Sequence, residues 1–104
     1  LTGVETGLTK ADRILYRHSM PNHAMVFIGV DSKKDKPVKW LVENSWGTDK
    51  GNKGLWSMYN CWFDEYVYTV IVHKKYVPKK VLALLDTEPM ILPAWDPMRS
   101  AFDK

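Results

Sequence analysis

Residues 38–47 read Val-Lys-Trp-Leu-Val-Glu-Asn-Ser-Trp-Gly, and this stretch decides the fold. Its first six residues alternate well enough between apolar and polar side chains to predict a β-strand. Asn44 to Gly47 then break the pattern, as a turn does. Residues 24–30, Ala-Met-Val-Phe-Ile-Gly-Val, are apolar and partly β-branched, which is typical of a buried strand. The lysine-rich residues 31–37 indicate a hairpin loop that joins the two strands.

The region after this hairpin is predicted to add two further strands. Residues 48–54 form a polar loop with two glycines, and residues 55–58 are short and strand-like. Residues 66–72, Tyr-Val-Tyr-Thr-Val-Ile-Val, are the strongest strand signal in the chain, because aromatic and β-branched residues favour sheets. The centre of the chain is therefore expected to be a small antiparallel β-domain.

The N-terminal side is predicted to hold a loop and a short helix. Residues 1–8 contain two glycines and no periodicity, which indicates a loop. Thr9 can cap a helix that continues to about Tyr16, with Asp12 returning the capping hydrogen bond.

The C-terminal side is predicted to hold a short helix over residues 79–85 and then an arm. Prolines recur every four residues after it, at Pro89, Pro93 and Pro97. This spacing opposes a regular helix and favours an extended, exposed arm. The arm carries large apolar side chains, so we expect it to pack on something, such as another subunit.

The composition is that of a small soluble domain. The chain has 104 residues, 45% of them hydrophobic and 26% charged, with a formal net charge of +3. The lysine clusters indicate solvated loops, with weak nucleic-acid binding as the alternative. No apolar run reaches the length of roughly 18 residues that spans a bilayer, so no membrane partner is expected.

The cysteine content and the N-terminus bear on compartment and processing. Cys61 is the single cysteine, which excludes an internal disulfide and fits a reducing, cytoplasmic compartment. No segment resembles a signal peptide, and the chain begins with Leu1, which suggests a processed or excised piece.

His23 and Asn44 are the candidate catalytic pair. His23 directly precedes one strand of the hairpin and Asn44 directly follows the other. In an antiparallel hairpin these two positions lie at the same end. An amide oxygen at that end can fix the tautomer and the orientation of an imidazole, which is the role of the third member of a Cys-His-Asn system. Trp46 could cover the contact and exclude water. Such a pair is by itself more often structural than catalytic.

Four segments carry a resemblance to a known family. The segments Asn22-His-Ala-Met25 and Trp40-Leu-Val-Glu-Asn-Ser-Trp-Gly47 resemble the His and Asn motifs of papain-like cysteine peptidases. The segments Trp62-Phe-Asp-Glu-Tyr-Val-Tyr68 and Ile91-Leu-Pro-Ala-Trp-Asp-Pro-Met98 resemble the bleomycin hydrolase/aminopeptidase C branch. The resemblance covers residues 10–98.

The resemblance implies a fold and a set of roles. It implies an α+β papain-like fold, of which residues 1–77 form the β-rich, barrel-like right half and residues 78–104 the short helix and arm. His23 matches the general base, Asn44 the residue that orients it, and Trp46 the tryptophan that shields their contact. The Cys nucleophile and the Gln of the oxyanion hole are expected in an upstream half. No metal or organic cofactor is implied.

The resemblance also implies an activity and an assembly. The full protein is expected to be an aminopeptidase that cleaves N-terminal residues from peptides, assembled as a homo-hexamer. In this family the chain end lies in the cleft and meets the amino group of the substrate. Residues 99–104, Arg-Ser-Ala-Phe-Asp-Lys, depart from the small apolar ending of the family, which puts this ruler function in doubt.

Cys61 is rejected as a substitute nucleophile. The pair Cys61-Trp62 mimics the Cys-Trp of the nucleophile motif, but Met-Tyr-Asn precedes it and no helix-start signal accompanies it. A partly buried structural cysteine is expected instead.

The alternative to an enzyme part is a catalytically inactive assembly or binding module. Direct nucleic-acid binding ranks third.

Overall fold

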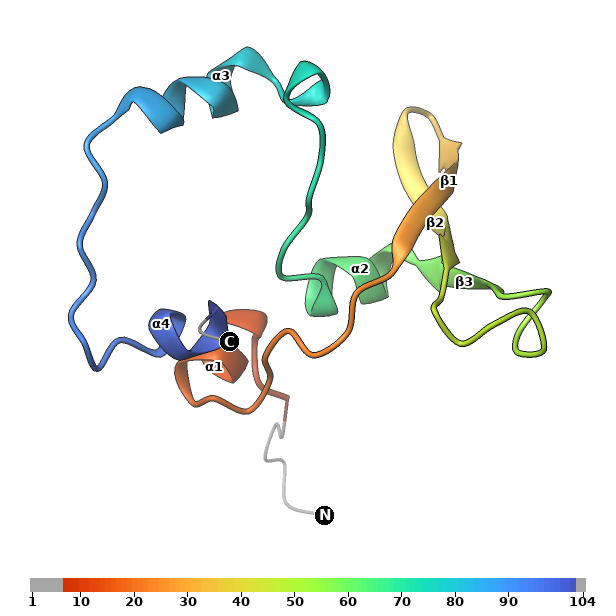
Figure 1. The fold of residues 1–104 in the computed structure, drawn as a ribbon, viewed down its shortest axis with the longest axis horizontal. Helices are drawn as coiled ribbons and strands as arrows, with labels where there is room; N and C mark the ends of the chain where they lie inside the picture. The colour runs from red at the N-terminus through yellow and green to blue at the C-terminus, as the bar shows by residue number, and fades with distance from the viewer. Residues whose placement is uncertain (1–6, 103–104) are drawn as a thin grey trace. The chain divides into compact units, whose positions relative to one another are not determined.

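The computed structural model describes residues 7–102, which form two compact units. One unit comprises residues 21–67, and the other combines the chain before residue 21 with the chain after residue 67. Each unit is described by itself (Figure 1). The loop predicted over residues 1–8 lies outside the described residues except for its last two positions. Among residues 7–102, no helix is both long and apolar enough to pass through a bilayer.

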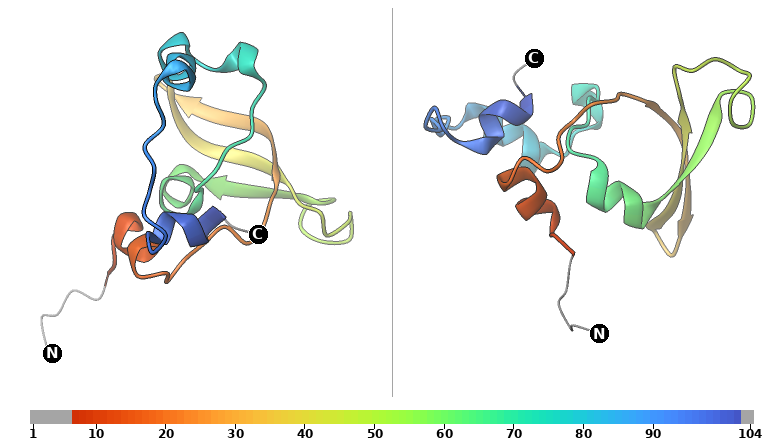
Figure 2. Two further views of the ribbon diagram at one scale, coloured as in Figure 1. Left: turned by 60° about the vertical axis from the view of Figure 1, so that its left-hand side comes forward. Right: turned by 90° about the horizontal axis from the view of Figure 1, so that it is seen from below.

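The unit of residues 21–67 is a three-stranded antiparallel sheet followed by a helix. Strands β1 (Val26–Lys33), β2 (Lys36–Glu43) and β3 (Leu55–Tyr59) lie in the order β1-β2-β3. Helix α2 (Asn60–Tyr66) follows β3 directly, as Figure 2 shows. The three strands predicted in this region are confirmed, with boundaries that differ by at most three residues.

The hairpin between β1 and β2 is tighter than the sequence predicts. Lys33 pairs with Lys36, so the loop predicted over residues 31–37 shrinks to Lys34 and Asp35. Both residues have a positive φ, 51° and 60°. Two left-handed residues give a type I′ turn, whose twist matches that of the flanking strands. The strands therefore continue to within two residues of each other.

One face of the sheet carries the core of this unit. Val42 is 1% exposed and Met58 is 7% exposed. Phe63 of α2 stacks on Trp40 of β2, with ring centroids 4.9 Å apart, and Phe27 of β1 meets Trp40 edge-on at 5.4 Å. The register pairs Trp40 with Met58, which places both side chains on the same face. The aromatic cluster therefore holds α2 against the sheet.

The prediction of a strand over residues 66–72 is wrong. Residue 66 ends α2, and residues 67–73 have no regular structure. β-propensity reflects packing on a neighbouring pleated surface, and within the described residues the sheet ends at β3. Ile71, which lies in this segment, is 98% exposed.

The other unit contains short helices. Helix α1 (Lys10–Leu15) has Thr9 as its N-cap, and the predicted capping box is confirmed because Thr9 Oγ1 accepts from the Asp12 N–H at 3.1 Å. Helices η1 (Lys74–Tyr76), α3 (Lys79–Leu82) and η2 (Ala83–Asp86) follow. The last two confirm the helix predicted over residues 79–85.

The C-terminal segment is only partly the extended arm that the prolines predict. Residues 87–93 have no helix or strand, as expected. Helix α4 (Pro97–Phe102) then begins at the third proline and packs against α1. Proline is tolerated at the first position of a helix, where its missing N–H has no intrahelical partner. The proline spacing therefore opposes a helix before Pro97 but not after it.

Candidate active site

The structure brings His23 and Asn44 into direct contact. His23 Nε2 lies 2.8 Å from Asn44 Oδ1. The register explains this, because Val26 pairs with Glu43 at the open end of the hairpin. His23 lies three residues before Val26, and Asn44 follows Glu43 directly. The juxtaposition predicted from the antiparallel topology is therefore confirmed.

The hydrogen bonds at Asn44 define which nitrogen of His23 carries the proton. The backbone N–H of Ser45 donates to Asn44 Oδ1 at 2.8 Å. A backbone N–H can only donate, so this side-chain atom must be the oxygen rather than the amide nitrogen. An amide oxygen can only accept, so His23 Nε2 must be the donor. In the neutral ring, Nδ1 is then an acceptor with a free lone pair.

Trp46 lies beside the imidazole. Its ring centroid is 5.5 Å from that of His23, with an interplanar angle of 31°. The two rings therefore lie side by side at a tilt, and the shielding of the hydrogen bond by Trp46 stays a prediction. Within the described residues Trp46 is still 60% exposed, so its outer face is open.

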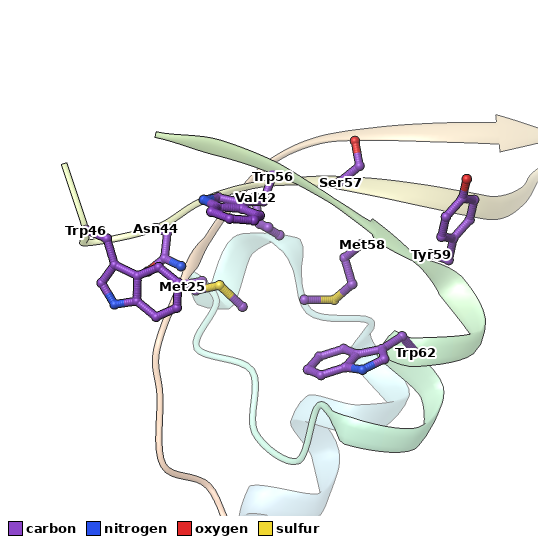
Figure 3. A pocket seen from close by; sticks show the side chains of 9 residues that line it. All are labelled: Met25, Val42, Asn44, Trp46, Trp56, Ser57, Met58, Tyr59 and Trp62. Carbon is purple, nitrogen blue, oxygen red and sulfur yellow. The ribbon is translucent and has the colours of Figure 1, made fainter. Parts of the chain in front are cut away.

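An apolar hollow of about 370 Å³ begins at Asn44 and Trp46 (Figure 3). The residues that line it all belong to the unit of residues 21–67 and are Met25, Val42, Asn44, Trp46, Trp56, Ser57, Met58, Tyr59 and Trp62. Most of them are aromatic or aliphatic. Asn44 therefore borders an apolar surface, while its hydrogen bond with His23 is exposed within the described residues.

Cys61 differs from its prediction. The sequence predicts a partly buried cysteine with no helix start beside it, whereas the structure exposes it in the first turn of α2. α2 packs on the sheet through Phe63. Two residues along a helix turn by about 200°, which points Cys61 away from the contact that Phe63 makes.

The remaining histidines have local structural roles. His18 lies in the turn after α1, where its backbone N–H donates to the Arg13 carbonyl oxygen at 2.8 Å. His73 caps η1, because its Nδ1 accepts from the Lys75 N–H at 3.2 Å. Within the part of the chain that the structure describes, His, Cys, Asp and Glu side chains do not gather in threes as metal ligands do.

Ser45 contributes to the site through its backbone, which side-chain patterns do not reveal. Its backbone N–H holds the amide of Asn44 in the orientation that accepts from His23. Any residue except proline supplies such a group, so no side-chain signal could have identified it.

The chain matches a family of peptidases and is similar to several known proteins. A family model described as the Peptidase C1-like family matches residues 1–99. The chain is similar to bleomycin hydrolase from Gallus gallus, at 53% identity over 94 residues that cover 88% of this chain and 21% of that protein. It is similar to aminopeptidase C from Listeria innocua, at 45% identity over 98 residues that cover 94% of this chain and 22% of that protein.

A solved structure shows the same fold. The crystal structure of PepW from Lactobacillus rhamnosis matches with a TM-score of 0.75 at 43% identity, over 90% of this chain and 22% of that one. The α+β fold predicted from the papain-like motifs is thus confirmed. The chain spans about a fifth of the length of these relatives.

Proposed function

Because the chain belongs to the Peptidase C1-like family, among relatives named bleomycin hydrolase and aminopeptidase C, we propose that it supplies the general base of a cysteine aminopeptidase. The observation that carries this proposal is the hydrogen bond between His23 Nε2 and Asn44 Oδ1. That bond leaves Nδ1 as the acceptor of an imidazole that Asn44 orients. A thiol nucleophile needs such a base beside it.

The nucleophilic Cys is proposed to lie in an upstream part of the full protein. The first relatives are about five times as long as the segment matched here. Residues 1–77 would then form the β-rich half of a two-part catalytic domain, and residues 78–104 its terminal helix and arm.

The reaction follows from the proton positions. Nδ1 of His23 takes the thiol proton, and the thiolate attacks the carbonyl carbon of the peptide bond. The imidazolium then gives this proton to the leaving amine as the C–N bond breaks, which leaves a thioester. Nδ1 next takes a proton from water, whose oxygen attacks the thioester. The carboxylic acid leaves, and the proton returns to the thiol sulfur.

Asn44 and Trp46 are proposed to act on His23 rather than on the substrate. Asn44 keeps the proton on Nε2 through every step, so that Nδ1 alone exchanges protons with the reacting groups. Trp46 limits the access of water to the Nε2–Oδ1 hydrogen bond. Both roles raise the fraction of enzyme in which the base has the required tautomer and position.

The aminopeptidase specificity, the homo-hexamer and the cytoplasmic location belong to the same proposal and rest on the resemblance. The ruler function of residues 99–104 is not included in this proposal. Residues 99–102 lie in α4, and residues 103–104 lie outside the described part of the chain.

A second candidate function is an assembly or binding module without chemistry. It is favoured by the exposed apolar side chains before α4, since Ile91 is 92% exposed and Trp95 is 76% exposed. Such side chains are costly to leave in water and fit a partner surface. Weak nucleic-acid binding by the lysine-rich loops ranks below it, and its sign would be an affinity that falls steeply with salt.

The test uses a chimera, called the joined enzyme below, in which this chain replaces the matching segment of the Listeria innocua aminopeptidase C. Hydrolysis of a fluorogenic aminoacyl amide by the joined enzyme is measured in reducing buffer. We expect activity that falls by about a thousandfold or more in His23→Ala, as for the loss of a catalytic base. The matched control is His73→Ala, which removes an exposed histidine from the other unit and should leave the rate unchanged.

Each outcome decides between the candidates. Activity that His23→Ala abolishes and His73→Ala retains supports the general-base role. A joined enzyme that folds and assembles but hydrolyses nothing favours the binding module. Activity that survives His23→Ala contradicts the proposal directly.

A further inference from the structure

The position of Trp46 over His23 needs a support that its own burial does not supply. Trp46 belongs to the loop after β2 and is 60% exposed within the described residues. Exposed side chains change rotamer on a picosecond to nanosecond timescale. A cover that holds one place beside the imidazole must therefore rest on something fixed.

Trp56 of β3 is in the right place to be that support. Its ring meets that of Trp46 edge-on, with centroids 6.1 Å apart and an interplanar angle of 87°. Edge-to-face pairs of this kind are favourable because the positive edge of one ring meets the negative face of the other. Figure 3 shows both indoles with Asn44 at one end of the hollow.

Trp56 is 39% exposed, against 60% for Trp46, and the pairing of β3 with β2 holds its backbone in place. Trp56 pairs with Val42, the most buried residue of the core, so the two side chains share a face. Asn44 lies two residues beyond Val42, just past the end of β2. The strand register thus aligns the support with the residue that orients His23.

Gly51 packs closely against the indole of Trp56. A Cβ atom at Gly51 would lie 2.8 Å from Nε1 and Cε2 of the Trp56 indole and 2.7 Å from the carbonyl oxygen of Leu55. Real Cβ atoms do not approach other atoms so closely. The φ of Gly51 is also +63°, which other residues adopt at a cost. The loop therefore closes over the indole only because residue 51 is glycine.

From this chain of contacts we infer that Trp56 is a positioning residue that holds Trp46 over the His23–Asn44 hydrogen bond, with Gly51 as the site that admits its indole. The inference rests on the proposed function, because it assigns Trp56 a role only if His23 is the base. Among the ring contacts of the described residues, Trp56 meets Trp46, and Trp46 in turn meets His23. Its effect on the rate must pass through Trp46.

The test measures kcat and KM of the joined enzyme for four single variants. Trp56→Leu keeps an apolar side chain on β3 but removes the ring, whereas Gly51→Ala keeps the ring but crowds both it and the Leu55 carbonyl oxygen. Both should lower kcat by about three- to tenfold with little change in KM, a fraction of the roughly hundredfold that a misplacement of 1 Å can cost. Trp56→Phe keeps an aromatic edge and should recover most of the loss.

The matched control is Trp62→Leu. Trp62 lines the same hollow from α2, but its ring contact is with Tyr66 rather than Trp46. The same loss of an indole from the same hollow should leave kcat unchanged within about twofold. If it lowers kcat as much as Trp56→Leu does, the effect comes from the hollow in general and the inference fails.

A double-mutant cycle separates positioning from general stability. In a Trp46→Ala background the cover is already gone, so Trp56→Leu should cause no further loss of kcat. A full additional loss would show that Trp56 acts by another route and would overturn the inference. If Trp56→Leu does not fold, the cycle is run with Gly51→Ala, for which the same two outcomes apply.

The failure of this inference is distinguishable from that of the proposed function. If His23→Ala is inactive while Trp56→Leu and Trp62→Leu have equal kcat values, only the role of Trp56 is wrong. If His23→Ala is active, the general-base role is wrong, and the inference falls with it.

Discussion

The indole of Trp40 donates a hydrogen bond from Nε1 to Asn60 Oδ1 over 3.0 Å, and so joins the middle of β2 to the first residue of α2. Asn60 in turn donates from Nδ2 to Asp64 Oδ2 at 2.9 Å, one helical turn later. Together with the stacking of Phe63 on Trp40, these bonds attach the helix to the sheet. The strand so anchored is β2, and Asn44 directly follows its last residue, Glu43.

Asn60→Ala should destabilise the joined enzyme by about 1–2 kcal/mol, because it leaves a half-buried indole N–H without its acceptor. The measurement is the free energy of unfolding from urea titrations. Trp40→Phe removes the donor, so the double variant has no unpaired indole N–H. Its loss of unfolding free energy should therefore be smaller than the sum of the losses in the two single variants. Additive losses would mean that the hydrogen bond contributes nothing. Asn52→Ala, at an exposed asparagine in the loop before β3, is the control.

Asn44→Ala should lower kcat by about ten- to a hundredfold, because the imidazole loses the acceptor that selects its tautomer. Asn44→Asp keeps an acceptor at the same place and should retain more activity than the alanine variant. Steady-state kinetics of the joined enzyme measure both. Equal rates for the two variants would contradict an orienting role for the side-chain oxygen.

Three glycines form a graded series for backbone strain. A Cβ atom added at Gly7 would meet no atom within 4 Å, and its φ is not positive, so Gly7→Ala should be neutral. Gly47 has a φ of +78° with open space, and Gly47→Ala should cost about 1 kcal/mol. Gly54 has a φ of +86°, and its added Cβ would meet the Gly47 carbonyl oxygen at 3.2 Å, so Gly54→Ala should cost more. Urea unfolding that ranks them otherwise would contradict this geometry.

Cys61→Ser should leave the activity of the joined enzyme within about twofold of the parent. Cys61 is exposed on α2, and the proposed nucleophile lies elsewhere in the full protein. The substitution changes one atom at a solvent-facing position, so little stability should be lost. An inactive serine variant that is folded normally would make Cys61 the nucleophile and refute its rejection.

Much of the sheet could be predicted because its signals are local. The β-branched and apolar residues of β1 and β2 mark strands without reference to the rest of the chain, and Thr9 with Asp12 marks the start of α1. Helix α2 lacks such a signal, because its N-cap residue Tyr59 makes no side-chain capping bond. It depends on the contact of Phe63 with Trp40, which only the folded sheet creates.

The candidate site was predictable to the level of residues but not of atoms. Topology alone places His23 and Asn44 at one end of the hairpin. Which imidazole nitrogen meets Asn44 depends on the orientation of the amide, and that is fixed by the Ser45 N–H. The support by Trp56 depends on the strand register and on the loop through Gly51, which the sequence pattern does not specify.

The turn at Lys34 and Asp35 is connected to the active-site geometry through the strand register. It lies at the closed end of the hairpin, and two register shifts, between Phe27 and Gly29 and between Asp31 and Ser32, separate it from the pairing of Val26 with Glu43 at the open end. Side chains alternate between the two faces of a strand, so a one-residue slip of β2 against β1 would turn Asn44 to the opposite face. Insertions in this exposed loop, where length variation is ordinarily harmless, would therefore be tolerated only if they preserve the pairing of Val26 with Glu43.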